Sequence, residues 1–229
     1  MISTRARSGS TLGEVTDSAW DEISQTIAAA PYPVTVLPPN PERAKECLAT
    51  LGVTTRSWLG GVIAHSGGLL VDHGWLRVFG SGSGELPDVL FDTDPAGGGL
   101  VIALDVLGGQ FAWVPAEPGQ PPTVHYFAPD DLAWQDLGRG YTDWLYSMLS
   151  GSMAQFYENL RWPGWEEEVA RLTLVQGIHT FPPPSTTEGK DLATVSRQAV
   201  PLAGLVEFHH DMARQLGEHE GPFQIRITP

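Results

Sequence analysis

The sequence predicts an α+β fold, in which an antiparallel sheet meander carries helices on one face and is followed by a C-terminal extension. Three observations predict it. Apolar residues recur at helical spacing over residues 17–66 and again over 141–160, whereas short β-rich runs fill the stretch 69–127. The chain of 229 residues contains 26 Gly and 19 Pro, which favours many turns over a helical bundle. Helices and strands grouped in this way are typical of α+β proteins.

The first part of the chain is expected to form helices around one short strand. Cap and stop residues define a helix that is capped by Asp17 and runs towards Pro31, a strand over 34–37, a helix from Pro41 to Gly52, and a helix that is capped by Thr54 or Thr55 and ended by Gly67-Gly68. The second helix carries Cys47 on its apolar stripe, so this thiol is expected in the core.

From residue 69 the apolar pattern changes to that of strands. The expected strands are 69–71, 75–79, 100–106, 110–114 and 123–127. Asp72-His73-Gly74 is expected to form a tight turn, and Gly108-Gly109 suits a two-residue hairpin. Consecutive strands with such connections predict an antiparallel meander.

One amphipathic helix is expected over Tyr141–Leu160, because its apolar residues recur at steps of three and four. The expected elements after it are an acidic helix over 166–172, strands over 178–181 and 223–227, and a helix over 202–216. The proline run 182–184 is expected to end a unit. The predicted organisation is a flexible tail over 1–15, an α+β domain over 16–184, and an extension over 185–229 that packs on the main domain.

The charge of the chain excludes one class of ligand. The chain has 13 Lys and Arg against 27 Asp and Glu, a formal net charge of −14 at pH 7, and such a field repels phosphate backbones. Nucleic acid is therefore not an expected ligand, whereas a basic partner protein such as a toxin is compatible with the charge. A homo-oligomer, in which a Trp-rich surface meets a second copy, is a further reading.

Cysteine usage and the N-terminal residues indicate the compartment. Cys47 is the only cysteine, so no intramolecular disulfide can form and the reducing cytoplasm is the expected location. The N-terminus lacks the apolar stretch of a secretory signal, and no run approaches the ~20 apolar residues of a membrane span. We expect a cytoplasmic protein without a membrane partner.

Two groups of polar residues are candidates for metal binding or acid–base chemistry. His65, Asp72 and His73 lie at a predicted helix end and turn, while Asp92 and Asp94 flank a threonine in a pattern that suits a hard cation. Side chains of these types in turns commonly make backbone hydrogen bonds instead. The sequence therefore predicts no metal and no cofactor. The five residues stay binding candidates, and a metal-dependent hydrolase is the alternative function.

Other catalytic patterns are incomplete. Glu207 and His210 have the Glu-x-x-His spacing of di-iron bundles, but a second copy of that step is missing from the sequence. There is no Gly-x-Ser-x-Gly elbow, and Cys47 on an apolar stripe is expected to be inert. Trp162 and Trp165, in a Trp-Pro-Gly-Trp turn, are instead candidates for an exposed aromatic anchor that binds a partner.

Two segments carry a resemblance to a known family. The segment 51–60, LGVTTRSWLG, and the segment 66–77, SGGLLVDHGWLR, resemble the bacterial family called domain of unknown function 2625, and the resemblance covers about residues 20–217. More distantly, the order of a helix ending at Gly67-Gly68, a sheet containing residues 104–109 and a helix starting near Tyr141 is similar to the SUKH superfamily.

The resemblance implies a binding role. SUKH domains are mostly regarded as non-enzymatic α+β binding domains, and many are immunity proteins that sequester toxins. The extension after Pro184 departs from a minimal SUKH domain and could cover its binding face. The first functional hypothesis is therefore a cytoplasmic, non-enzymatic protein-binding module of immunity or regulatory type.

Overall fold

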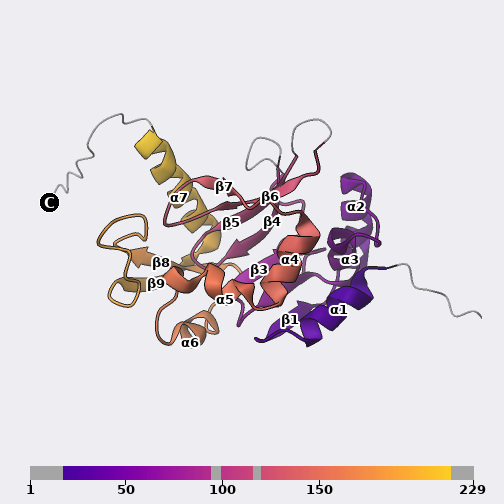
Figure 1. Ribbon diagram of the computed structural model, residues 1–229, viewed down its shortest axis with the longest axis horizontal. Coiled ribbons are helices and arrows are strands. Elements are labelled where there is room, and N and C mark those ends of the chain that lie inside the picture. Colours follow the sequence, from indigo (N-terminus) through magenta and orange to yellow (C-terminus); the bar gives the residue numbers. More distant parts are fainter. Residues whose placement is uncertain (1–17, 94–98, 116–119, 218–229) are drawn as a thin grey trace, which may run out of the picture.

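The computed structural model describes residues 18–93, 99–115 and 120–217 (Figure 1). The elements in chain order are α1 (Trp20–Ala28), β1 (Val34–Leu37), α2 (Pro41–Leu51), α3 (Trp58–His65), β2 (Gly68–Val71), β3 (Leu76–Phe79), β4 (Leu100–Asp105), β5 (Gln110–Val114), β6 (Thr123–Phe127), β7 (Trp134–Asp136), α4 (Tyr141–Leu149), α5 (Ser152–Phe156), a 3-10 turn (Glu158–Leu160), α6 (Trp165–Val169), β8 (Gln176–Phe181), β9 (Ser196–Pro201) and α7 (Leu202–Gly217). The expected tail over 1–15, the Asp17 cap and the expected strand over 223–227 lie outside the described residues.

The α+β prediction is confirmed, and the main sheet is the expected meander. Its seven strands lie in the order β1 to β7, and every neighbouring pair is antiparallel. A second sheet pairs β8 with β9, also antiparallel. Short connections join β2 to β3 and link β4 through β7, because an antiparallel partner can follow after only a few residues. Helices α2 and α3 lie between β1 and β2, and residues 80–99 lie between β3 and β4.

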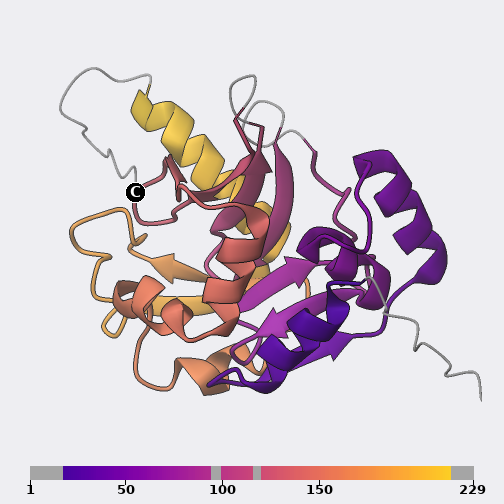
Figure 2. The ribbon, with the colours of Figure 1, turned by 45° about the vertical axis from the view of Figure 1, so that its right-hand side comes forward.

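One face of the main sheet packs against α4 and α5. Phe111 of β5 contacts Trp144 of α4 and Phe156 of α5, with ring centroids 5.2 and 5.7 Å apart. Helices α1 and α3 also contact α4, and Tyr32 donates a hydrogen bond to the Met148 carbonyl. Figure 2 shows α4 and α5 crossing in front of the sheet, beside the N-terminal helices.

The opposite face of the sheet packs against α7. Gln110 and Phe111 are consecutive on β5, so their side chains point to opposite faces. Gln110 hydrogen-bonds with His210 of α7, which places this helix on the face away from α4. A Cβ at Gly108 would lie 3.0 Å from the Leu205 side chain, so the β4–β5 turn touches the same helix. The sheet is thus covered on both sides by elements from the second half of the chain (Figure 1).

The single helix expected over Tyr141–Leu160 is wrong. The structure divides this segment into α4, α5 and a 3-10 turn. Gly151 between α4 and α5 has φ +103°, a conformation that ends a right-handed helix and that glycine adopts without steric cost. The apolar spacing continues across the break because both helices bury side chains against the same sheet face.

The cap and stop expected for the third helix are also wrong. The N-cap of α3 is Ser57, whose hydroxyl accepts a hydrogen bond from the Gly60 amide, whereas Thr54 contributes its carbonyl to the preceding turn. The helix ends at Ser66 in an extended conformation, and Gly68 already belongs to β2. Thr54, Thr55 and Ser57 all carry hydroxyls that can cap a helix. The cap is Ser57 because it directly precedes Trp58, the first residue of the helix.

Two strands were missed by the sequence prediction. Strand β7 has three residues, and β9, SRQAVP, has no run of apolar residues. Both lie at an edge of their sheet, where half of the backbone groups and many side chains face solvent. Among the described residues, no helix combines the length and the hydropathy needed to cross a bilayer.

Candidate functional site

The residues proposed from the sequence lie in three places. His65 ends α3 and stacks on Trp20, with ring centroids 5.4 Å apart. Asp72 and His73 lie in the β2–β3 turn, close to the Trp162–Trp165 segment. Asp92 lies at a cleft near α7, and Asp94 is outside the described residues. The structure therefore brings Asp72, His73, Trp162 and Trp165 together and leaves His65 and Asp92 apart from them.

The β2–β3 turn holds three consecutive residues in the left-handed region. Asp72, His73 and Gly74 have φ +52°, +59° and +85°. The Trp75 amide donates to the Asp72 carbonyl, so His73 and Gly74 occupy the two central positions, where a type I′ turn requires positive φ. Asp tolerates this conformation better than most non-glycine residues. The turn presents the Asp72 carboxylate towards the interior, and only 4% of the residue is exposed.

Arg161 occupies the centre of this cluster. Its guanidinium lies 4.1 Å from the ring centroid of Trp165 and 4.9 Å from that of Trp75, and its Nη2 lies 2.8 Å from an oxygen of Asp72. The other oxygen of Asp72 lies 3.1 Å from Nδ1 of His73. The carboxylate is thus engaged by two partners on its own protein. The contacts of this cluster therefore stabilise the fold and leave no open site for a ligand.

Trp162 and Trp165 are buried, with 2% and 9% of their surface exposed. The indole of Trp162 donates a hydrogen bond to Glu168, and both rings pack on Trp75. They are therefore not the exposed aromatic anchor that the Trp-Pro-Gly-Trp turn suggested. Arg161 was not predicted, because it follows a short 3-10 turn and belongs to no local sequence pattern.

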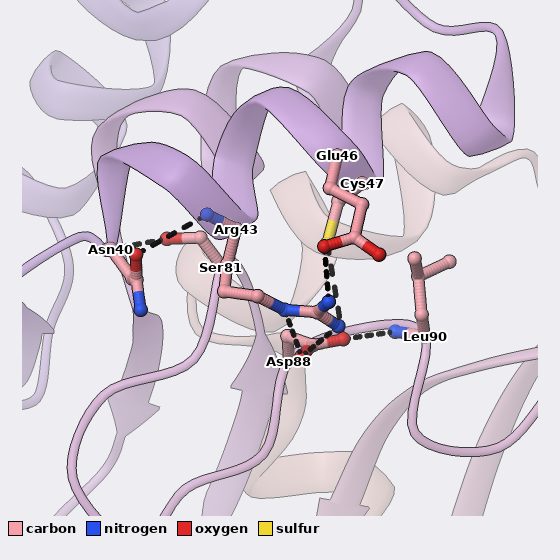
Figure 3. Close-up of polar contacts among 7 residues, drawn as sticks. All are labelled: Asn40, Arg43, Glu46, Cys47, Ser81, Asp88 and Leu90. Carbon is pink, nitrogen blue, oxygen red and sulfur yellow. Dashed lines mark hydrogen bonds and ion pairs between the residues drawn. The ribbon is translucent and has the colours of Figure 1, made fainter.

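A polar cluster joins α2 to the loop before residue 90 (Figure 3). Arg43 donates two hydrogen bonds to one oxygen of Asp88, and the other oxygen accepts from the Leu90 amide and lies 3.8 Å from the Cys47 sulfur. Burial is the main reason that the pKa of the Cys47 thiol rises to about 11, and the Asp88 charge adds to the shift. A thiol in this state is a poor nucleophile.

We expect Cys47 to resist alkylation in the folded protein. At pH 8 a pKa of about 11 leaves about one thiol in a thousand ionised, and the side chain is 0% exposed. Because Cys47 is the only cysteine, iodoacetamide labelling followed by mass spectrometry reads this site alone. The same protein in denaturant is the control, and native labelling as fast as that of the denatured chain would contradict the expectation.

Asp105 forms a second buried polar network, between the sheet and α5. One oxygen accepts hydrogen bonds from the Leu107 and Gly109 amides, and the other accepts from the hydroxyls of Tyr126 and Tyr157 at 2.8 and 3.1 Å. Burial raises the pKa of Asp105, and the four hydrogen bonds oppose that shift. The carboxylate is 0% exposed, so it holds the β4–β5 turn rather than meeting a ligand.

Metal binding gains no support from the part of the chain that the structure describes. No group of three or more His, Cys, Asp or Glu side chains is arranged there to hold an ion. Glu207 and His210 contribute to separate contacts, because Glu207 lines a cleft while His210 hydrogen-bonds with Gln110. Among the concave surfaces of the described residues, this cleft has the most hydrophobic lining.

The cleft has a volume of about 690 Å³ and lies between the main sheet and α7. Strands β3, β4 and β5 contribute its floor, and the segments 85–92, 173–176 and 201–207 form its walls. Most of the lining is hydrophobic, and Phe91 and Val175 are 46% and 44% exposed. Exposed apolar side chains around a concave apolar surface are typical of a binding site.

Arg77 is the cationic residue among the described residues that line the cleft. It is 3% exposed, and its Nη1 donates a hydrogen bond of 2.7 Å to the Leu174 carbonyl. Burial lowers its pKa to about 10, so the guanidinium stays protonated at neutral pH. Sequence reasoning missed it, although a charged residue inside the apolar run WLRVF was a usable signal.

Comparisons with known proteins agree on the family. The model of the family described as protein of unknown function DUF2625 matches residues 10–205. The uncharacterised protein YbfG of Escherichia coli K12 is 38% identical over 202 residues, which cover 86% of this chain and 92% of the relative. An uncharacterised protein of Haemophilus influenzae is 34% identical over 165 residues, 68% of this chain and 72% of the relative. No solved structure shows a significant match. With most of its length matched, the chain belongs to the DUF2625 family.

Proposed function

We propose that this protein is a non-enzymatic binding module and that its binding site is the cleft between the main sheet and α7. The observation that carries the proposal is the cleft itself, whose hydrophobic lining includes the half-exposed Phe91 and Val175. Its volume of about 690 Å³ falls within the usual range for sites that bind small ligands or anchor side chains.

The state of the polar candidates favours binding over catalysis. Asp72 is paired with Arg161, Asp88 with Arg43, and Asp105 accepts four hydrogen bonds. A general base or nucleophile needs a free lone pair within reach of a substrate. These three carboxylates instead use their oxygens to hold elements of the fold together.

The regulatory or immunity type of this module is part of the proposal. The net charge of −14 would speed association with a basic protein, and a toxin is one such partner. The resemblance to the SUKH superfamily motivates the immunity type. In this proposal an acidic surface attracts the partner protein from a distance, while the cleft supplies a separate apolar contact.

Occlusion of the cleft tests the proposal. Ala203 is exposed at the start of α7 and lines the cleft, so Ala203→Trp would fill part of it without changing the core. Titration with the neutral dye Nile red should show saturable binding to the wild type. We expect Ala203→Trp to weaken this binding by at least about tenfold, because the indole displaces the dye from the apolar walls.

The matched control is Ala49→Trp, which adds the same side chain at an exposed position of α2 away from the cleft. This variant should bind the dye like the wild type. The proposal fails if the wild type shows no saturable binding, or if both tryptophan variants behave alike.

A further inference from the structure

We propose that the cleft binds a small amphipathic carboxylate, with the apolar part of the ligand against the cleft walls and its carboxylate paired with the Arg77 guanidinium. This inference rests on the proposed function, because it names the ligand class of the same cleft. It depends on the position of Arg77, the state of its donors and the charges around it.

Arg77 lies on β3, in register with Leu70 of β2 and Leu104 of β4. Its neighbour Leu76 is in register with Asp105, so Arg77 and Asp105 point to opposite faces of the sheet. Asp105 faces the α5 side, where Tyr126 and Tyr157 donate to it. The guanidinium therefore faces the cleft and α7 without that carboxylate beside it.

The donors of Arg77 are only partly used. A guanidinium carries five N–H donors, and the structure gives Arg77 one hydrogen bond, from Nη1 to the Leu174 carbonyl. Within the described residues, Nε and Nη2 have no hydrogen-bond partner, and Arg77 lines the cleft. An anion in the cleft can accept from these donors.

Other arginines of the described chain show what Arg77 lacks. Arg161 pairs with Asp72, and Arg197 pairs with Glu168. No described Asp or Glu lies within ion-pairing distance of Arg77, although it is 3% exposed. The Asp105 charge acts on Arg77 from the opposite face of the sheet, but no described carboxylate contacts the guanidinium. Burying a cation without a contacting partner is costly, and an anionic ligand in the cleft lowers that cost. The fork of N–H groups matches a carboxylate in two parallel hydrogen bonds.

The walls of the cleft indicate the polarity and size of the part of the ligand beyond its carboxylate. Phe79, Leu104, Leu174, Leu202 and Val206 line it, so the part of the ligand beyond the carboxylate must be apolar. The volume of about 690 Å³ accommodates an alkyl chain or an aromatic ring system of small-molecule size.

The other charges at the cleft are negative, so general electrostatic attraction cannot explain the binding of an anion there. Glu85, Asp92 and Glu207 also line the cleft, and the whole chain carries a net charge of −14. These exposed or partly exposed charges repel an anion at long range, and salt screens them, whereas a contact with buried Arg77 is screened much less. Affinity for the carboxylate should therefore hold or rise with added salt, contrary to binding by surface lysines.

Calorimetric titration with decanoate and with decanol at pH 8 tests the inference, since the two ligands share an alkyl chain and differ in charge. Decanoate should bind the wild type at least about tenfold more tightly than decanol, as expected for a charge-assisted pair. Arg77→Met should bind both ligands within about twofold of each other, because the apolar walls remain. Ala203→Trp should bind neither ligand, and Ala49→Trp should match the wild type.

Arg77→Lys is the second variant, and it keeps the charge in case Arg77→Met does not fold. It should retain part of the preference for decanoate. Equal binding of the two ligands to the wild type, or an unchanged preference in Arg77→Met, would overturn the carboxylate assignment. If neither ligand binds while Nile red binding stays sensitive to Ala203→Trp, the assignment also fails and the proposed function stands. If the dye does not bind either, both fail.

Discussion

Replacing Asp105 by alanine is expected to lower the free energy of unfolding by about 3–5 kcal/mol, because the change removes the acceptor of four hydrogen bonds in a fully buried network. The Leu107 and Gly109 amides and the Tyr126 and Tyr157 hydroxyls would lose this partner. Each unsatisfied buried donor is costly, and the hydroxyls can find other acceptors only if the core rearranges. Urea unfolding followed by tryptophan fluorescence measures the loss.

Asp105→Asn is the matched control for this prediction. The amide oxygen can accept from the two backbone N–H groups, while the amide nitrogen can donate to tyrosine hydroxyls that rotate to accept. Burial already disfavours the charged form, as the raised pKa of Asp105 shows. We expect Asp105→Asn to cost less than half as much as Asp105→Ala. Equal losses in the two variants would contradict the hydrogen-bond explanation.

Arg161→Met is expected to lower the free energy of unfolding by about 3 kcal/mol or more, since it leaves the Asp72 carboxylate buried without its cation. The flexible side chain of methionine can still fill the space between Trp75 and Trp165, so the loss reports mainly on charge. Denaturant unfolding of the variant, compared with the wild type, gives the value.

A double-mutant cycle with Asp72→Asn isolates the interaction between the two residues. Asparagine tolerates the left-handed conformation at φ +52°, so it removes the charge without straining the turn. The double variant should lose less stability than the sum of the single variants, with a coupling on the order of 1–3 kcal/mol. Additive losses would show that Asp72 and Arg161 contribute independently and that the pair does not stabilise the fold through a mutual interaction.

Elements with a strong local pattern could be predicted from the sequence. Strands β1, β5 and β6 have the expected bounds, because turn residues on both sides limit where each run of strand-forming residues can pair. Helix α2 was expected from Pro41 to Gly52, and Gly52 has φ +63° at its C-cap, as a helix stop requires. In these cases propensity, apolar spacing and cap residues all favour the same structure.

Predictions failed where tertiary contacts decide the structure. The apolar stripe over Tyr141–Leu160 continues across a helix break at Gly151, so periodicity alone could not reveal the break. Strand β9 forms because β8 offers a pairing edge, although its own sequence has little strand signal. Local pattern carries no information about a partner that is distant in the chain.

The candidate sites differ in how much the sequence revealed. Asp72, His73 and Trp165 were recognised one by one, but Arg161, which joins them, lies 89 residues beyond Asp72 and has no motif. The cleft was not predicted, because β3, the segment 173–176 and the first turn of α7 form it only after the sheet is covered. A charged residue inside an apolar strand, as at Arg77, is the signal that could have led to it.

The β4–β5 turn makes contacts on both faces of the sheet, with Asp105 on the α5 side and with α7 on the other. Asp105 fixes the Leu107 and Gly109 amides from the α5 side, while Gly108 between them, at φ +85°, abuts Leu205 and His209 of α7. The turn that this buried carboxylate holds is therefore one of the contacts, together with β8 and β9, that position α7 and one wall of the cleft. Substitutions in the interior under α5 would change how open the cleft is, so its selectivity can be tuned without altering a single residue of its lining.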